Sequence, residues 1–473
     1  MRRFLLTFAV AALALGAGAA SCSGESGNTA APVIVNPGDS ENTGGDDTPT
    51  SGDTPSVGKT IPAWVKGNLD IHFINTTHGE CTFIILPDGT QILVDAAGAE
   101  QATGTVGSTT NVGIRSRWDP TKESGFDCAA FIMEYIDKCM EWTGNKTIDY
   151  VVDTHFHNDH YGAHLTKPVS TKSSTYRLQT LVKILESYPI GKLMDRGWPD
   201  YDYPFNMMKY YKATSESSVY NWITAVKWLN ANNNLNVEKF SAGSNTQMAL
   251  KYDASTFSNC RIQNLSVNGD VWTGVGTGYT ATFPELSKIV CASPPSVANG
   301  DCCPEENHES CTFKVSYGAF DYFAGGDLQY DGMSSYSWKD IETVVAKACG
   351  VVDVMKADHH GVSNTNGYGY KDKAWAMKHL SPTCWIVNSW TDGHPRQTTF
   401  EGVTGYLPNL NVFITNSCSS QEAYANYSKC VKGRDGHIVV RVSNGGAKYS
   451  VYTLTDSDRK MTIKSISGPY TSR

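Results

Sequence analysis

Several features that would define large protein classes are missing from this sequence of 473 residues. After the first 21 residues, no apolar run reaches the roughly 18 residues that a membrane-spanning helix needs, so we expect no internal membrane span. No Cys-x-x-Cys pair occurs, which argues against a zinc ribbon. No Gly-x-Ser-x-Gly motif occurs, which argues against a serine hydrolase of that type. No internal repeat is found, which argues against a solenoid or a propeller.

An excess of positive charge is also lacking. The chain has 39 Lys and Arg against 47 Asp and Glu, and its net charge is −8. Proteins that coat nucleic acid depend on many cations facing phosphates. The sequence therefore gives no strong nucleic-acid-binding signal, although a local basic groove stays open. With 40% hydrophobic and 18% charged residues, the composition is that of a globular protein.

The first 21 residues have the pattern of a signal peptide, which must be set apart from the fold. Arg2 and Arg3 precede an apolar stretch over 4–15, and small residues lead to Cys22. The segment resembles a bacterial lipoprotein signal, in which the cysteine becomes lipidated. We therefore expect export and lipid anchoring at Cys22 to the cell envelope of a bacterium, at the outer membrane or the cell surface. A secretory signal cut nearby is the alternative.

Residues 22–60 are rich in Gly, Ser, Thr, Asn, Pro and Asp and have few apolar residues. Such a composition cannot bury enough surface to offset the entropy of ordering, so we expect a flexible tether. Apart from Cys22 there are 12 cysteines, and an exported protein can form disulfides. Cys418 and Cys430 are close enough in the sequence to form a short staple.

Residues 61–473 alternate between strand-like and helix-like patterns and form one predicted domain. Alternating apolar residues indicate strands, and apolar residues three and four apart indicate helices. We expect strands over 69–74, 81–86, 91–94, 148–153, 313–323, 351–357, 383–388, 437–442 and 447–454, and helices over 127–142, 180–188, 217–230, 340–349 and 371–379. This order predicts an α/β protein with two sheets flanked by helices. Residues 188–206 and 293–306 are expected as surface insertions.

The densest group of candidate ligands follows the strand predicted over 148–153. Three imidazoles and a carboxylate occur within six residues, in His155-Phe156-His157-Asn158-Asp159-His160. His155 and His157 are two residues apart in an extended segment and therefore point the same way. Asp159 and His160 follow the bend and can reach a second ion. Imidazole ligands suit zinc, copper, iron and nickel, and the carboxylate beside them adds manganese to this choice.

This cluster resembles the signature of the metallo-β-lactamase superfamily, His-x-His-x-Asp-His after a strand. The resemblance extends over most of residues 69–455 and implies a four-layer αββα sandwich. It also implies roles for three further positions. Asp95 matches an aspartate that supports the site, Asp327 matches the carboxylate that bridges two ions, and His359 matches a late histidine ligand. The implied metal ligands are His155, His157, Asp159, His160, Asp327 and His359.

A succession of short motifs resembles one branch, the hydrolase domain of bacterial DNA-uptake (competence) proteins and its stand-alone relatives. In order, they are His78-Gly79-Glu80-Cys81-Thr82, Leu86-Pro87-Asp88-Gly89, Asn307-x-x-Ser310, Tyr317-Gly318, Gly326-Asp327, His359-His360-Gly361 and Gly393-His394-Pro395. The membrane-channel portion of those proteins is absent from the sequence. DNA import is therefore not implied.

The resemblance leaves some positions open. Many superfamily members have another metal-binding histidine between the cluster and the bridging aspartate, where this chain has only His164 and His308. We expect both to have other roles. By analogy with relatives, His359 is the expected ligand and His360 lines the pocket. His394 is expected to donate to a substrate oxygen or to protonate a leaving group, unless it is only a hydrogen-bonded loop residue.

The resemblance implies a metal-dependent hydrolase with two divalent ions, zinc or manganese, and Asp159 and His394 as candidate catalytic residues. Hydroxide formed on the ions would attack phosphorus or a carbonyl carbon. We expect a phosphodiesterase or nuclease-like enzyme, acting on a small molecule or a short phosphodiester. The alternatives are hydrolysis of a lactone, thioester, ester or lactam on the same site, and a catalytically silent surface binding protein. The sequence identifies no protein partner.

Overall fold

The computed structural model describes most of the chain after residue 53. The described residues are 54–76, 78–98, 105–106, 109–110, 127–163, 165, 169–213, 217–285, 303–330, 337–362, 375–457 and 459–473. They belong to one compact unit, Pro49–Arg473. The predicted signal peptide, Cys22, most of the predicted tether and most of 293–306 lie outside the described residues.

One large sheet is built from both ends of the described chain. Strands β20 to β3 of this sheet pair antiparallel, and strands β3, β6, β7 and β8 pair parallel. The strands, in sheet order, are β20 (Ile463–Thr471), β19 (Lys448–Leu454), β18 (His437–Ser443), β1 (Leu69–Phe73), β2 (Cys81–Ile85), β3 (Gln91–Ala96), β6 (Tyr150–Val152), β7 (Leu193–Asp195) and β8 (Val237–Lys239).

The second large sheet is built from the later part of the chain. Strands β11 to β13 pair antiparallel, and strands β13 to β17 pair parallel. The strands, in sheet order, are β11 (Tyr279–Ala281), β10 (Asp270–Trp272), β9 (Cys260–Val267), β12 (Thr312–Tyr317), β13 (Phe320–Ala324), β14 (Val354–Lys356), β15 (Cys384–Val387), β16 (Asn411–Ile414) and β17 (Val431–Arg434). A separate short pair is formed by β4 (Thr105–Val106) and β5 (Thr109–Thr110).

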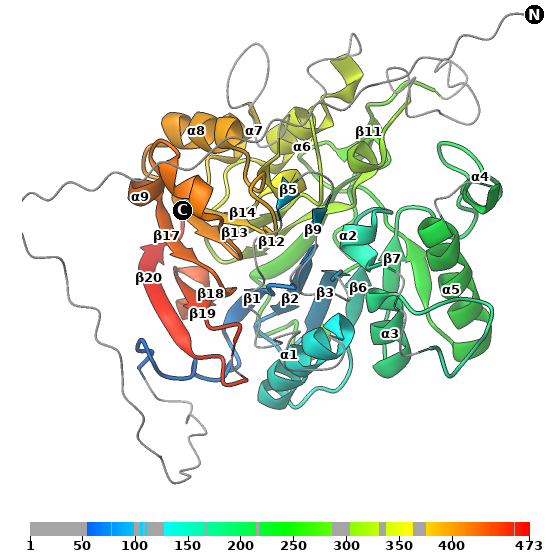
Figure 1. Ribbon diagram of the computed structural model, residues 1–473, viewed down its shortest axis with the longest axis horizontal. Helices are drawn as coiled ribbons and strands as arrows, with labels where there is room; N and C mark the ends of the chain where they lie inside the picture. The colour runs from blue at the N-terminus through cyan, green and yellow to red at the C-terminus, as the bar shows by residue number, and fades with distance from the viewer. Residues whose placement is uncertain are drawn as a thin grey trace, which may run out of the picture. The chain divides into compact units, whose positions relative to one another are not determined.

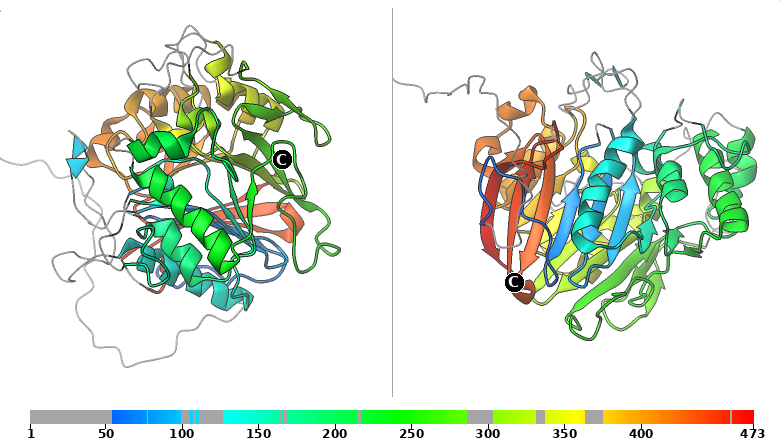
Figure 2. Two further views of the ribbon diagram at one scale, coloured as in Figure 1. Left: turned by 90° about the vertical axis from the view of Figure 1, so that its right-hand side faces the viewer. Right: turned by 90° about the horizontal axis from the view of Figure 1, so that it is seen from below.

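The two sheets pack face to face, and helices cover the outer face of each. Residues of both sheets form the central core, and two further cores lie between a sheet and its helices. The first sheet packs against α1 (Cys128–Thr143), α3 (Thr180–Ser187), α4 (Met207–Ala213) and α5 (Ser217–Asn233), and the second against α6 (Ile341–Cys349), α7 (Trp375–Leu380), α8 (Gln397–Tyr406) and α9 (Tyr427–Cys430). Helices α6 to α8 and helix α1 lie on opposite sides of the strands (Figure 1; left view of Figure 2). The predicted four-layer αββα sandwich is confirmed.

Alternation along the strands explains how each sheet presents two buried faces. In β1, Leu69, Ile71 and Phe73 face the core between the sheets. His72 points the other way, where its Nδ1 lies 3.0 Å from the hydroxyl of Tyr135 on α1. Side chains two apart share a face of a strand, so β1 contributes to two layers.

The parallel strands bring the ends of distant segments to one region. Strands β3 and β6 of the first sheet pair in parallel, and so do β13, β14 and β15 of the second. Binding sites in α/β proteins commonly form beyond the carboxyl ends of such strands, where connecting loops carry polar side chains. The histidine cluster, Asp327, His360 and His394 all follow these strands.

Three expectations differ from the structure. Residues 188–206 are not only a surface insertion, because β7 of the first sheet lies within them and Arg196 is 1% exposed. Part of the predicted tether is ordered, since the amide of Gly58 donates to the carbonyl of Ile463 at 2.8 Å. Cys418 and Cys430 are not joined by a disulfide, so the predicted staple is wrong.

Among the described residues, no helix has the length and apolarity to cross a membrane.

Candidate metal centre

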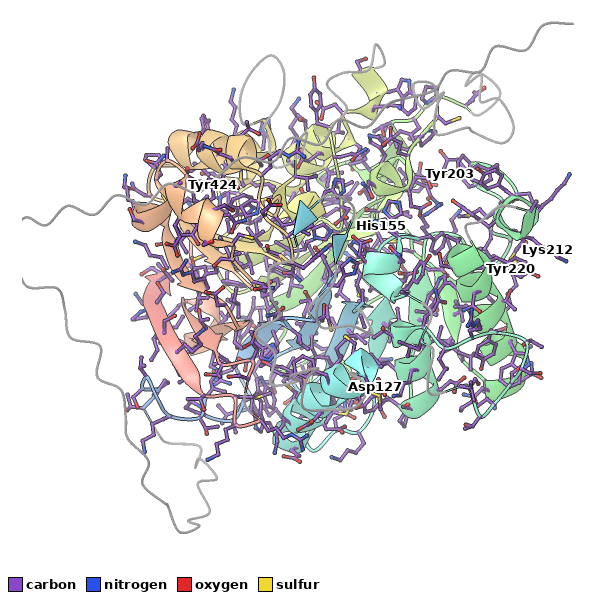
Figure 3. All side chains as sticks on the ribbon, viewed as in Figure 1. Asp127, His155, Tyr203, Lys212, Tyr220 and Tyr424 are labelled. Atoms are coloured by element: carbon purple, nitrogen blue, oxygen red, sulfur yellow. The ribbon has the colours of Figure 1, made fainter. Side chains whose placement is uncertain are left out.

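The histidine cluster lies at the carboxyl end of β6 and continues into α2 (Asn158–Tyr161). His155 is fully buried and is labelled beside α2 in Figure 3. Its Nε2 lies 3.0 Å from Nδ1 of His157 and 3.8 Å from Oδ2 of Asp327. The two imidazole nitrogens therefore face one place and can share a cation.

His160 lies between two carboxylates. Its Nδ1 lies 2.7 Å from Oδ2 of Asp95, and its Nε2 lies 3.1 Å from Oδ2 of Asp327. The hydroxyl of Thr154 donates to the same Asp95 oxygen at 2.8 Å. Metal-binding histidines are commonly oriented by a carboxylate on the ring nitrogen that faces away from the ion. Asp95 occupies that position relative to His160.

A left-handed backbone turn carries the late histidines. In the 3-10 helix η5 (Asp358–Gly361), φ is 43° at His359, 55° at His360 and 76° at Gly361. L-residues with side chains rarely adopt this conformation, and it is concentrated at functional sites. The turn places Nε2 of His360 3.3 Å from Oδ2 of Asp159 and 3.2 Å from Oδ2 of Asp327.

The structure thus brings His360 into the cluster and leaves His359 outside it, which differs from the expected assignment. A ring nitrogen of His359 lies 3.3 Å from Nδ2 of Asn307. Adjacent side chains point in different directions whatever the backbone conformation, so only one of the two histidines can face the cluster. The left-handed turn points His360 towards the cluster, and the spacing of residues in the sequence does not reveal this turn.

Four side chains form a group that could hold one cation. The ligand atoms of Asp159, His160, Asp327 and His360 lie within 4.8 Å of one another. Two atoms bound to one ion at about 2.0–2.1 Å in a tetrahedron lie roughly 3.3 Å apart, which matches the 3.1–3.3 Å separations above. Nε2 of His360 is buried and makes no hydrogen bond with the described residues. The residues present therefore fit a divalent ion of the zinc or manganese type.

A second ion would have fewer protein ligands. His155 and His157 would share it with Asp327, whose Oδ2 faces both positions. His308 does not join them, because its Nδ1 accepts a hydrogen bond from the amide of Glu305 at the start of the 3-10 helix η3 (Glu306–Glu309). His164 lies outside the described residues.

The charges of the site are strongly coupled. Although burial opposes it, the neighbouring imidazoles hold the pKa of Asp327 well below its usual range, and the His360 and His160 rings do the same for Asp159. Burial alone would lower the pKa of His360, but the surrounding carboxylates raise it to about 10. Asp327 and Asp95 raise the pKa of His160 well above its ordinary value against the same effect of burial. These raised pKa values favour the charged form of both imidazoles in the metal-free protein.

An aromatic wall, formed by the rings of Trp390, His394 and His78, lies beside the cluster. The ring of Trp390 lies 4.3 Å from that of His360, 4.4 Å from that of His394 and 5.1 Å from that of His78, measured between centroids. His394 stacks on His360 at 4.9 Å. Its Nδ1 is buried and makes no hydrogen bond with the described residues. Burial and the charge of His360 lower the pKa of His394 well below its ordinary value, so its neutral ring can donate a hydrogen bond.

Two charged residues of the site were not identified from the sequence. Glu80 precedes β2, and Lys356 ends β14; both are 3% exposed. Glu80 belongs to the motif that begins at His78, and its place in that motif could have identified it as a residue of the site. A lysine at a strand end is usually solvated, so Lys356 carried no signal of its own.

A glycine allows the Glu80 segment to approach α2. The amide of Glu80 donates to the carbonyl of Asp159 at 2.9 Å. A Cβ atom on Gly79, whose φ is +107°, would lie 2.4 Å from that same carbonyl oxygen and 2.5 Å from Cβ of Ala97. Only glycine avoids both the clash and the strain, so Gly79 sets the distance between Glu80 and the candidate metal ligands on α2.

Comparison with known proteins gives little beyond this geometry. No family model matches the sequence, and no curated protein matches it. Among solved structures, the chain is similar to a protein of Parabacteroides distasonis that carries the provisional description metal-dependent hydrolase, with 12% identity and a TM-score of 0.28. The similarity covers 73% of this chain and 92% of the other. At this TM-score it supports no inference about the site.

Proposed function

We propose that this protein is a metal-dependent hydrolase of the metallo-β-lactamase superfamily. The observation that carries the proposal is the convergence of Asp159, His160, Asp327 and His360 from three separate segments onto one position, with all but Asp159 buried. His160 and His360 each have a further carboxylate, Asp95 or Glu80, about 3 Å from the ring nitrogen that faces away from Asp327. The αββα sandwich and the His-x-His-x-Asp-His spacing support the superfamily assignment.

Divalent ions bound here would supply activation of water and stabilisation of negative charge. The protein's own residues would hold and orient the reactants. Asp327 presents Oδ2 to both ion positions, and His394 presents a neutral ring nitrogen beside His360 to a substrate oxygen. The aromatic wall lies on this side of the cluster, against His360.

We propose a phosphodiester as the substrate, with carbonyl compounds as the alternative. Two ions can hold the attacking and leaving oxygens of a displacement at phosphorus, and the motif order shared with the DNA-uptake hydrolases favours the same choice. The acidic balance of the chain disfavours long nucleic acid. A small phosphodiester or a short oligonucleotide is therefore the proposed substrate class.

The test is a substrate panel on protein with zinc or manganese restored. The panel contains an activated aryl phosphodiester, a lactone, a thioester and a chromogenic β-lactam, and kcat/KM is measured for each. We expect the phosphodiester to be the best substrate. A lactone hydrolysed about a hundredfold faster would overturn the substrate class, and no turnover of any member with metal bound would favour a binding protein. His394→Ala should lower phosphodiester kcat without loss of metal.

We also propose that the protein acts outside the cytoplasm of a bacterium, anchored through lipid on Cys22. The support is the sequence of the first 22 residues alone. Full-length protein should fractionate with membranes, and Cys22→Ala should be recovered in the soluble fraction. If the Cys22→Ala protein fractionates like the parent, the anchor proposal is wrong.

A further inference from the structure

A buried ion pair joins the two sheets beside the candidate metal ligands. Nζ of Lys356, at the end of β14, lies 2.7 Å from Oε1 of Glu80, which precedes β2 in the other sheet. Side-chain exposure is 4% for each partner. Buried charges are costly unless they are paired and satisfied, so this pair calls for a specific explanation.

The lysine ammonium contacts two further oxygens. Besides its ion pair with Glu80, it donates to the carbonyl of Gly326 at 2.5 Å and to Oδ1 of Asp327 at 3.5 Å. Lys356 therefore fixes both the backbone and the carboxylate of the segment that carries Asp327.

The contacts divide the two oxygens of Asp327 between different partners. Oδ1 faces Lys356. Oδ2 faces the Nε2 atoms of His160, His360 and His155, at 3.1, 3.2 and 3.8 Å. Rotation of the carboxylate about its Cβ–Cγ bond would exchange these roles, and the position of Lys356 opposes that rotation.

The glutamate has the corresponding relation to the other ligand. Oε1 of Glu80 lies 3.0 Å from Nδ1 of His360, on the side of the ring opposite the cluster. With Nδ1 facing this carboxylate, Nε2 faces Asp159 and Asp327. One ion pair thus contacts two of the four side chains that could hold the cation.

We propose that Lys356 and Glu80 are positioning residues of the metal centre, which set the Asp327 carboxylate and the His360 ring for metal binding. The inference rests on the proposed function only in requiring that the site binds a divalent ion. It does not require any particular substrate.

The test measures zinc affinity by competition with a chromogenic chelator in the full chain carrying Lys356→Met, Lys356→Arg or Glu80→Gln. Loss of a residue that orients a metal ligand typically weakens metal binding by about 10–100-fold. We expect Lys356→Met and Glu80→Gln to fall in this range and Lys356→Arg, which keeps the charge, to recover part of the affinity. The visible spectrum of bound Co²⁺ should also change, because the ligand geometry changes.

A second buried ion pair provides the matched control. Arg441 and Asp70 lie 2.6 Å apart, with side-chain exposures of 9% and 0%, on the face of the first sheet that is covered by α1. Asp70→Asn should lower the melting temperature of the metal-free protein but change zinc affinity by no more than about twofold, since it does not contact the ligands.

Wild-type zinc affinity and an unchanged Co²⁺ spectrum in Lys356→Met and Glu80→Gln would overturn the proposal. If Lys356→Met does not fold, the zinc affinity and Co²⁺ spectrum of the isosteric Glu80→Gln variant decide whether the proposal stands. Zinc binding is measured without substrate. A wild-type protein that binds zinc tightly but hydrolyses nothing would therefore overturn the proposed function and leave this inference standing.

Discussion

Asp327 is the carboxylate that faces all three buried imidazoles of the candidate centre. Replacing it by alanine removes a ligand from both ion positions at once. We expect Asp327→Ala to retain little of the metal that the wild-type protein holds after purification without chelator, as measured by elemental analysis. Asp392→Ala, at an exposed position near His394, is the control and should retain wild-type content. Wild-type metal content in Asp327→Ala would show that the ion binds elsewhere.

Protons and metal compete for His160 and His360. Their pKa values are raised in the metal-free protein, that of His360 to about 10, whereas an unperturbed histidine titrates near 6.5. Between pH 6.5 and 10, zinc must displace the proton of His360, so its affinity should rise with pH by up to about tenfold per unit for that proton. Calorimetry in two buffers of different ionisation enthalpy should report proton release at pH 7. Release of none would contradict the protonated state.

The same shifts act on the metal-free fold with a definite sign. A pKa raised by folding stabilises the protein below the unfolded value, near pH 6.5, and this contribution is lost as pH rises towards the folded value. For His360 that loss extends to about pH 10. The metal-free protein should therefore lose free energy of unfolding between pH 6.5 and 10 in denaturant titrations. His360→Gln should show a smaller loss over that range, and an equal loss would mean that other groups cause it.

The segment after β7 connects the histidine cluster to the second sheet. Arg196 stacks on the ring of Phe156 at 4.5 Å, and its Nε donates to Oε1 of Glu306 at 2.5 Å. The same oxygen accepts the amide of Phe156 at 2.7 Å, and Glu309 lies 2.6 Å from the guanidinium. Arg196 thus holds the turn between His155 and His157 through side chains of η3.

Removing this guanidinium would leave two carboxylates without their cation in a buried place. We expect Arg196→Met to cost about 3–5 kcal/mol of unfolding free energy, measured by denaturant titration of the metal-free protein. The matched control is Arg459→Met, because Arg459 pairs with Glu134 but is 63% exposed. That variant should change stability by less than about 1 kcal/mol. Equal effects of the two substitutions would contradict a role for the buried network.

Elements with strong periodic patterns were predictable, and short ones were not. Helix α1 carries apolar residues at helical spacing, with Asp127 capping its start and Gly144 its end, and the β2–β3 hairpin has a Pro-Asp-Gly turn. Strand β7 is only three residues long, and Pro189, Gly191 and Gly197 around it predict a loop. It is a strand because β6 and β8 pair with it on both sides, a tertiary effect that local pattern does not contain.

Some residues of the candidate site were likewise predictable from the sequence, and others were not. Candidate ligands that are close in sequence, from His155 to His160, were recognisable because one strand and one turn determine their relative placement. The choice between His359 and His360 depended on a left-handed turn, and the roles of Glu80 and Lys356 depended on contact between two sheets. These are properties of the assembled sandwich, in which residues 276 positions apart form one ion pair.

At the scale of the whole molecule, the candidate centre joins the two sheets. Asp159 and His160 follow β6 of the first sheet, and Asp327 and His360 follow β13 and β14 of the second. A bound ion should therefore stabilise the folded protein, by about 2.7 kcal/mol at a free metal concentration of 100 times Kd. Differential scanning calorimetry should show a lower melting temperature after chelation and recovery when zinc is restored. Asp327→Ala is the control, because its melting temperature should not respond to zinc. A wild-type protein that binds zinc without any change in melting temperature would contradict a centre shared by the two sheets.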